Sequence, residues 1–154
     1  MQENVRDQAF HFYTALRRIR EHVDEYYSSE ISLGIAARIA GMERTYFSAF
    51  FRRKVGVTFT FWLASVRIAK AKTLIETSDH SITEIGYAVG FESSRTFERA
   101  FKKHEQLTPR QFRECVKAHS ETEGTPGRVK LTEATHIAVK TTAVSSSSVY
   151  KFSR

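Results

Sequence analysis

The segment 94–103 carries two arginines one helical turn apart, Arg95 and Arg99, with Glu98 between them. A guanidinium presents a fixed fork of N–H donors that fits a phosphate or the O6 and N7 acceptors of guanine. A carboxylate can accept a hydrogen bond from the exocyclic amine of cytosine. These residue types at helical spacing predict a helix face that reads base edges, with the candidates Ser94, Arg95, Glu98 and Arg99.

An earlier segment, 44–54, has a similar pattern with shorter side chains. Its candidate base-reading positions are Arg44, Thr45, Ser48 and Ala49. Apart from the arginine, these side chains offer little beyond a hydroxyl contact or a contact with a thymine methyl. Basic residues near the end of each segment are predicted to contact DNA phosphates, or alternatively to be solvated and to favour the helix dipole: Arg52, Arg53, Lys102 and Lys103.

The composition favours an anionic partner. The chain has 154 residues, a formal net charge of +7 and a pI near 9.7, which fit nucleic acid or an acidic membrane surface. No apolar run is long enough to span a membrane, so we expect no membrane partner. One cysteine, Cys115, and six scattered histidines predict no disulfide, metal or other cofactor, and a reducing, cytoplasmic compartment. No catalytic motif is recognisable, so we expect no enzyme.

The fold class expected from periodicity is all-α. Apolar residues at steps of three and four predict a first helix that ends near the "YYSSE" stretch. Ser32, Ser81 and Thr108 precede further apolar segments as helix caps, and glycines end two of the helices. The expected later helices cover about 33–40, 44–55, 60–77, 82–89, 93–104 and a segment from 109 onward. Arg67, inside the apolar 60–77 helix, is interpreted as an internal salt-bridge partner.

Two of these helix pairs repeat each other. Ala37 and Gly86 are offset by 49 residues, as are Gly41 and Gly90, and in each copy the small residue stands four before the glycine. This spacing predicts a helix-turn-helix, because the small residue allows close helix crossing and the glycine makes the turn. The second helix of such a motif fits the major groove of DNA. The bridge helix between the copies would span about 27 Å at 1.5 Å per residue, comparable with the ~34 Å between successive groove faces.

These stretches resemble the AraC/XylS family of transcription regulators, in its DNA-binding domain, over roughly residues 10–117. "GVTFTFWLASVRIAKAKTLI" is similar to the family's linker-helix signature, and "SITEIGYAVGFESSRTFERAFKKHEQLTPRQFR" to its second-motif signature. The resemblance implies two helix-turn-helix subdomains joined by a long linker helix, about seven helices in all. Four positions differ from the family's usual residue: Glu43 (Ser), Ala49 (Arg), Gly86 (Ala) and Gln106 (Gly). At Gln106 we expect the helix to need another cap.

The expected domain organisation has five parts. A lead covers 1–9, the first subdomain 10–57, the linker helix 58–78 and the second subdomain 79–119. Residues 120–154 change to a Ser- and Thr-rich composition, which predicts a mostly disordered tail with one weak strand candidate near 135–139.

The function expected from these features is a sequence-specific transcription regulator of bacterial type, located at the nucleoid. Its expected partner is double-stranded promoter DNA, bound as a monomer or weak dimer, and RNA polymerase is a second candidate partner. Two alternatives stay open: an architectural protein that binds DNA nonspecifically, and the DNA-binding part of a longer ligand-sensing regulator.

Overall fold

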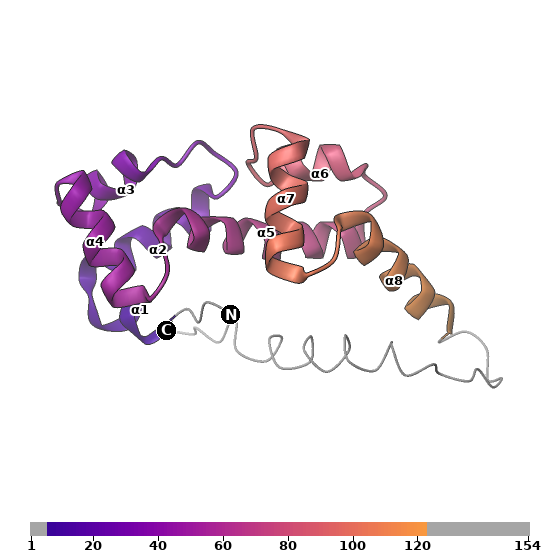
Figure 1. The fold of residues 1–154 in the computed structure, drawn as a ribbon, viewed down its shortest axis with the longest axis horizontal. Helices are drawn as coiled ribbons and strands as arrows, with labels where there is room; N and C mark the ends of the chain where they lie inside the picture. Colours follow the sequence, from indigo (N-terminus) through magenta and orange to yellow (C-terminus); the bar gives the residue numbers. More distant parts are fainter. Residues whose placement is uncertain (1–5, 123–154) are drawn as a thin grey trace. The chain divides into compact units, whose positions relative to one another are not determined.

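The computed structural model describes residues 6–122, and over that range all regular secondary structure is helical (Figure 1). The chain divides into two units, Met1–Ala118 and His119–Arg154, and the fold below belongs to the first. Residues 120–122 of the expected tail belong to the last helix, the rest of the tail and its strand candidate lie outside the described residues, and the expected domain boundaries stay predictions. The helices are α1 (Gln8–Phe12), α2 (Thr14–Tyr26), α3 (Leu33–Ala40), α4 (Arg44–Val55), α5 (Phe59–Thr77), α6 (Ile82–Ala88), α7 (Ser94–Glu105) and α8 (Pro109–Thr122).

The seven expected helices are all present, and the short α1 precedes them. Tyr13 separates α1 from α2 because its backbone is extended, with φ −105° and ψ 112°. The bounds of α3 and α4 are those expected from the sequence.

Capping residues define the first motif. The Ser32 side chain accepts a hydrogen bond from the Ile35 amide and so begins α3. Gly41 ends α3 in the left-handed conformation, with φ 67°.

The second motif begins with a capping box, in which Ser81 and Glu84 each accept a hydrogen bond from the other's backbone amide. Gly90, with φ 90°, makes the turn before α7.

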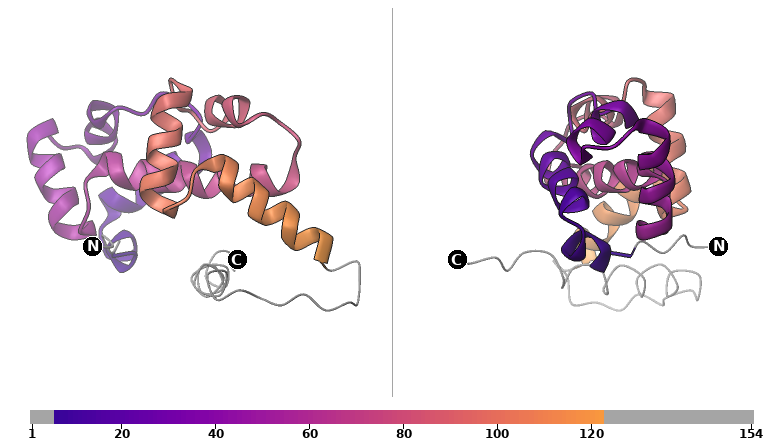
Figure 2. Two further views of the ribbon diagram at one scale, coloured as in Figure 1. Left: turned by 45° about the vertical axis from the view of Figure 1, so that its right-hand side comes forward. Right: turned by 90° about the vertical axis from the view of Figure 1, so that its left-hand side faces the viewer.

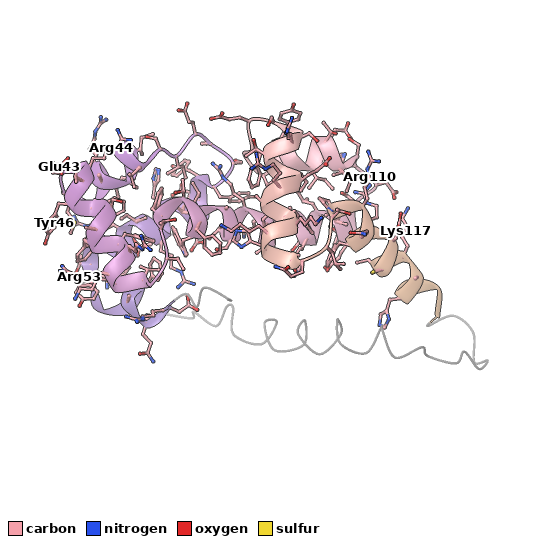
Figure 3. All side chains as sticks on the ribbon, viewed as in Figure 1. Glu43, Arg44, Tyr46, Arg53, Arg110 and Lys117 are labelled. Carbon is pink, nitrogen blue, oxygen red and sulfur yellow. The ribbon has the colours of Figure 1, made fainter. Side chains whose placement is uncertain are left out.

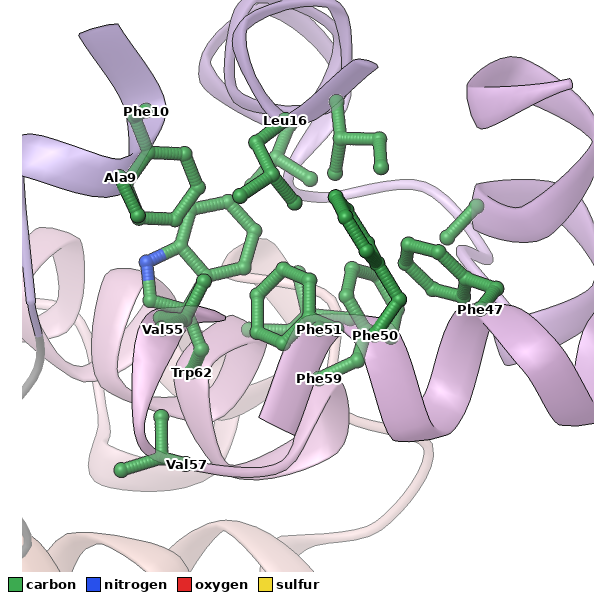
Figure 4. Packing of buried hydrophobic residues seen from close by; sticks show 14 of the residues in the cluster. Ala9, Phe10, Leu16, Phe47, Phe50, Phe51, Val55, Val57, Phe59 and Trp62 are labelled. Atoms are coloured by element: carbon green, nitrogen blue, oxygen red, sulfur yellow. The ribbon is translucent and has the colours of Figure 1, made fainter. Parts of the chain in front are cut away.

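The bridge helix α5 contributes to two hydrophobic cores. Phe59, Trp62 and Leu63, in its first half, pack with the first motif. Figure 4 shows Trp62 among Phe10, Phe51 and Phe59, and the Phe10 and Trp62 rings stack with centroids 5.0 Å apart. The second half of α5 packs with the second motif, through Ile68, Ala71 and Ile75.

The interpretation of Arg67 as a salt-bridge partner is wrong in its chemistry. Its Nε donates to the Tyr27 carbonyl and its Nη2 to the Ser29 carbonyl, each at 2.8 Å. Within residues 6–122 the arginine therefore has internal partners, but they are backbone carbonyls rather than a carboxylate.

In the second motif, α6 and α7 lie side by side in Figure 2 and pack closely. A Cβ added at Gly86 would lie 2.9 Å from Cδ1 and 3.2 Å from Cβ of Phe97. Phe97 is fully buried, so its ring has little room to move. Glycine at this position, where the family usually has alanine, therefore allows the phenyl ring to lie directly against the α6 backbone.

The C-terminus of α7 is closed by Gln106 itself and not by another cap, which corrects the expectation. Gln106 adopts φ 62°, the only non-glycine residue with positive φ in the described part of the chain. Its amide donates to the Lys102 carbonyl, and its Nε2 donates to the Lys103 carbonyl at 3.0 Å. The side-chain bond partly offsets the cost of a left-handed backbone in a residue with a Cβ.

Gln106→Gly should therefore raise the free energy of unfolding by about 0.5–1 kcal/mol, because glycine adopts positive φ without steric cost. The matched variant Gln106→Ala keeps the Cβ and loses the side-chain bond, and should lower it. Chemical denaturation of the three proteins measures both changes. A glycine variant less stable than the parent would contradict this explanation of the cap.

Candidate nucleic-acid interface

One face of α4 is free of core contacts. Phe47, Phe50, Phe51 and Val55 are buried, which fixes the rotation of the helix about its axis. All the positions predicted to read bases or contact phosphate on this helix are exposed: Arg44, Thr45, Ser48, Ala49, Arg52 and Arg53. Figure 3 shows Arg44 near the beginning of the helix and Arg53 near its end.

The same face recurs on α7. Phe97 and Phe101 are buried, and Arg95, Glu98, Arg99, Lys102 and Lys103 are exposed, while Ser94 is half-buried. The exposed positions of the two helices correspond at a constant offset of 50 residues. The structure thus presents two similar helix faces, each following a left-handed glycine turn.

The polar side chains on α7 differ in their partners. Ser94 Oγ donates to Glu98 Oε1 at 3.3 Å, so these two candidates contact each other. Among the described residues, no ion pair or side-chain hydrogen bond involves Arg95 or Arg99. The guanidinium groups therefore remain available to an external acceptor.

The residue before α4 caps it. Glu43 Oε2 accepts from the amides of Thr45 and Tyr46 at 2.7 and 2.9 Å. These backbone hydrogen bonds lower the pKa of the Glu43 carboxyl below its ordinary value, because they favour the charged form. A glutamate in place of the family's serine thus preserves the cap and adds a negative charge at the beginning of the helix.

The four candidate phosphate contacts are not equivalent. Arg52, Arg53 and Lys102 are exposed and lie in the last turns of their helices. Lys103 is also exposed, but its Nζ lies 5.0 Å from the centroid of the Phe61 ring on α5. A phosphate contact by Lys103 therefore competes with this cation–π contact.

The C-terminal end of α7 is held against α5. Lys72 Nζ and Glu105 Oε2 form an ion pair of 2.7 Å, and both side chains are about three quarters buried. The His104 and Phe61 rings lie 4.4 Å apart. These contacts fix the C-terminal end of α7 against α5.

Sequence reasoning missed Tyr46, which is 57% exposed on α4 although it is aromatic. Its ring stacks on Phe50, with centroids 6.3 Å apart. Tyr46 directly follows the candidate Thr45 on α4, and this neighbouring position is the sequence signal that could have indicated a role for Tyr46.

Two basic grooves were also missed. One, of about 570 Å³, is lined by Arg6, Arg53 and Lys54 at the end of α4. The other, of about 430 Å³, lies where the first turn of α6 meets Arg110, Arg113 and Lys117 of α8. Figure 3 shows Arg110 and Lys117 projecting from α8. In the first groove Arg6 is distant in sequence from Arg53 and Lys54, whereas the three cations of the second groove stand on α8 at helical spacing.

Residues 6–122 contain neither a metal-binding cluster nor a membrane-spanning helix. No group of three or more His, Cys, Asp or Glu side chains could hold a metal ion there. None of the helices in this range is both long and apolar enough to cross a membrane.

Known proteins are similar to this chain in sequence. An uncharacterised HTH-type transcriptional regulator of Escherichia coli strain K12, YijO, is 30% identical over 95 residues, which are 62% of this chain and 34% of that protein. The regulatory protein PocR of Salmonella typhimurium is 27% identical over 105 residues, which are 68% of this chain and 35% of PocR. The chain thus spans about a third of the length of these relatives.

Two solved structures are similar in fold. The C-terminal domain of the response regulator yesN from Fusobacterium nucleatum is 32% identical with a TM-score of 0.60, covering 64% of this chain and 97% of that one. The DNA-binding domain of AdpA, solved in complex with a target DNA, is 27% identical with a TM-score of 0.64, covering 68% and 95%. A sequence model described as a helix-turn-helix domain matches residues 36–114, which is half of the chain. The chain therefore belongs to the AraC-type helix-turn-helix family.

Proposed function

We propose that this protein is a sequence-specific DNA-binding transcription regulator that inserts α4 and α7 into successive major-groove segments of promoter DNA. The observation that carries the proposal is the repeated exposed face on the two helices. Each helix buries phenylalanines on one side and presents polar and basic side chains on the other. A helix of this kind can enter a major groove while its apolar side stays in the protein core.

The chemistry of α7 supports base reading. Arg95 and Arg99 are exposed, and an arginine can donate two hydrogen bonds to guanine. Glu98 can accept from cytosine once its contact with Ser94 is given up. The second motif therefore carries most of the discrimination between sequences.

The first motif contributes fewer base contacts. Thr45, Ser48 and Ala49 are short, and Arg44 is the only long basic side chain among the four candidates. Tyr46 adds an exposed hydroxyl and ring beside them. We propose that α4 mainly positions the protein on the DNA backbone, with help from Arg52 and Arg53.

The relatives support the same assignment. YijO is described as a transcriptional regulator, and the AdpA domain was solved with a target DNA. Because the chain spans only about a third of the length of the curated relatives, we also propose, as an alternative, that it acts as the DNA-binding part of a longer regulator.

We further propose that the protein is bacterial and cytoplasmic and lies at the nucleoid. It would bind DNA as a monomer or weak dimer, with RNA polymerase as a second candidate partner.

Selection of bound sequences from a random DNA pool tests the proposal. We expect enrichment of one preferred site. An architectural, nonspecific binder would instead yield no enriched sequence and would bind the selected and random DNA equally.

On the selected site, Arg95→Ala and Arg99→Ala should each weaken binding by about 1–3 kcal/mol and relax the preference at one base pair. Ser48→Ala should weaken binding by well under 1 kcal/mol, because a serine hydroxyl cannot make the two-fold hydrogen bond to a base that an arginine makes. Affinity on each single-base variant of the site measures both effects. Equal loss of specificity from Ser48→Ala and Arg99→Ala would refute the unequal division between motifs.

Binding should also weaken steeply as salt rises, since each phosphate neutralised by a cation releases counterion, with a log–log slope near −0.9 per contact. Lys102→Ala should weaken all sequences alike and reduce the slope by about 1. Arg17→Ala is a control, because Arg17 is paired with Glu21 on the surface of α2. A slope near zero for the parent protein would contradict phosphate contact altogether.

A further inference from the structure

Arg67 joins the bridge helix to the end of α2. Its Nε and Nη2 atoms donate to the carbonyls of Tyr27 and Ser29, each at 2.8 Å. These carbonyls belong to the Tyr27–Ser29 turn, which directly follows the last residue of α2. One side chain thus makes two hydrogen bonds to a segment about 40 residues earlier in the chain.

The end of α2 needs such a partner. The last carbonyls of a helix receive no hydrogen bond from an N–H of the same helix, and they carry partial negative charge. The last turn of α2 contains no basic residue of its own. Arg67 supplies a cation from another helix, and its partial burial lowers the pKa of the guanidinium, an effect that the negative charge of Glu92 opposes.

The second motif meets the same turn. A Cβ added at Gly90 would lie 2.8 Å from the carbonyl oxygens of both Tyr27 and Ser28, so the two backbones are in direct contact. The Arg67 guanidinium also lies 5.7 Å from the centroid of the Phe91 ring. Tyr27 packs against both hydrophobic cores. A single turn after α2 therefore contacts α5 and the turn of the second motif.

We propose that Arg67 is a positioning residue that fixes the second motif against the first and so sets the spacing between α4 and α7. The first core holds α2 and α4 together, through Val23 and Phe47 among others. The second core holds the Gly90–Phe91 turn beside α7, through Phe91 and Phe97. The Arg67 contacts connect these two bodies at the turn where the Tyr27 side chain also packs against both cores.

The consequence for DNA rests on the proposed function. Two recognition helices in a fixed relative position lose rotational freedom only once when they bind two groove segments. Two loosely joined helices must also lose the freedom that they have relative to each other. The Arg67 contacts should therefore raise affinity at one spacing of the segments and penalise all others.

A measurement without DNA tests the positioning role. Spin labels at the exposed positions Ala49 on α4 and Ala88 on α6 are introduced as Ala49→Cys and Ala88→Cys, with the exposed Cys115 changed by Cys115→Ser. The distance distribution should be narrow in the parent. Arg67→Gln should broaden it about twofold or more, with helical content by circular dichroism unchanged, because amide donors replace the longer guanidinium fork.

Two variants make this measurement decisive. Arg67→Lys keeps the charge but replaces the fork with an ammonium, so it should broaden the distribution by less. It also serves if Arg67→Gln does not fold. Arg17→Gln removes an exposed arginine from α2 and should leave the distribution unchanged. A distribution in both Arg67 variants as narrow as in the parent would overturn the proposal.

The DNA arm uses the selected site with its spacer changed by one or two base pairs. The parent should lose about tenfold or more in affinity, equivalent to about 1.4 kcal/mol, and Arg67→Gln should lose about threefold or less. Both should bind DNA carrying only the second-motif segment equally well. The same spacing penalty in both proteins would contradict the proposal. If no sequence is preferred at all while the spin-label result holds, the proposed sequence-specific function fails and the positioning role stands.

Discussion

The fold depends on the burial of α5 on two sides. Its first half completes a core of packed aromatic rings around Trp62, and its second half completes a separate core around Ile68 and Ala71. Both motifs place their apolar side chains on short helices, which depend on tertiary packing for their stability, and α5 supplies part of that packing to each. Shared use of α5 therefore makes the two motifs parts of one folded unit.

This constraint decides which side chains remain exposed. Once Phe47, Phe51, Phe97 and Phe101 are buried against α5 and its neighbours, the rotation of α4 and α7 is fixed. The basic and polar residues of the two helices then lie on faces that no core residue covers. The geometry that stabilises the protein is thus the geometry that presents the proposed DNA-reading residues, and the Arg67 contacts add a fixed relation between the two faces.

Much of this follows from local sequence. Phenylalanines at steps of three and four identified the buried sides of α4 and α7, and the Ser32 and Ser81 caps are formed as expected. The contacts that escaped prediction depend on the backbone. Nothing local indicates that Gln106 adopts positive φ or that the carbonyls of Tyr27 and Ser29 accept from Arg67, because every residue has a carbonyl and only the tertiary fold brings the partner within reach. The grooves beside Arg53 and Arg110 likewise combine distant segments.

In the proposed complex, one chain presents two helices to two groove segments at a fixed spacing. Hydroxyl-radical footprinting on the selected site tests it most directly, because cleavage of each sugar reports contact at single-nucleotide resolution. We expect two protected segments one helical turn, ~10 base pairs, apart on the same face of the duplex. A single protected segment, or uniform protection without a face, would contradict it.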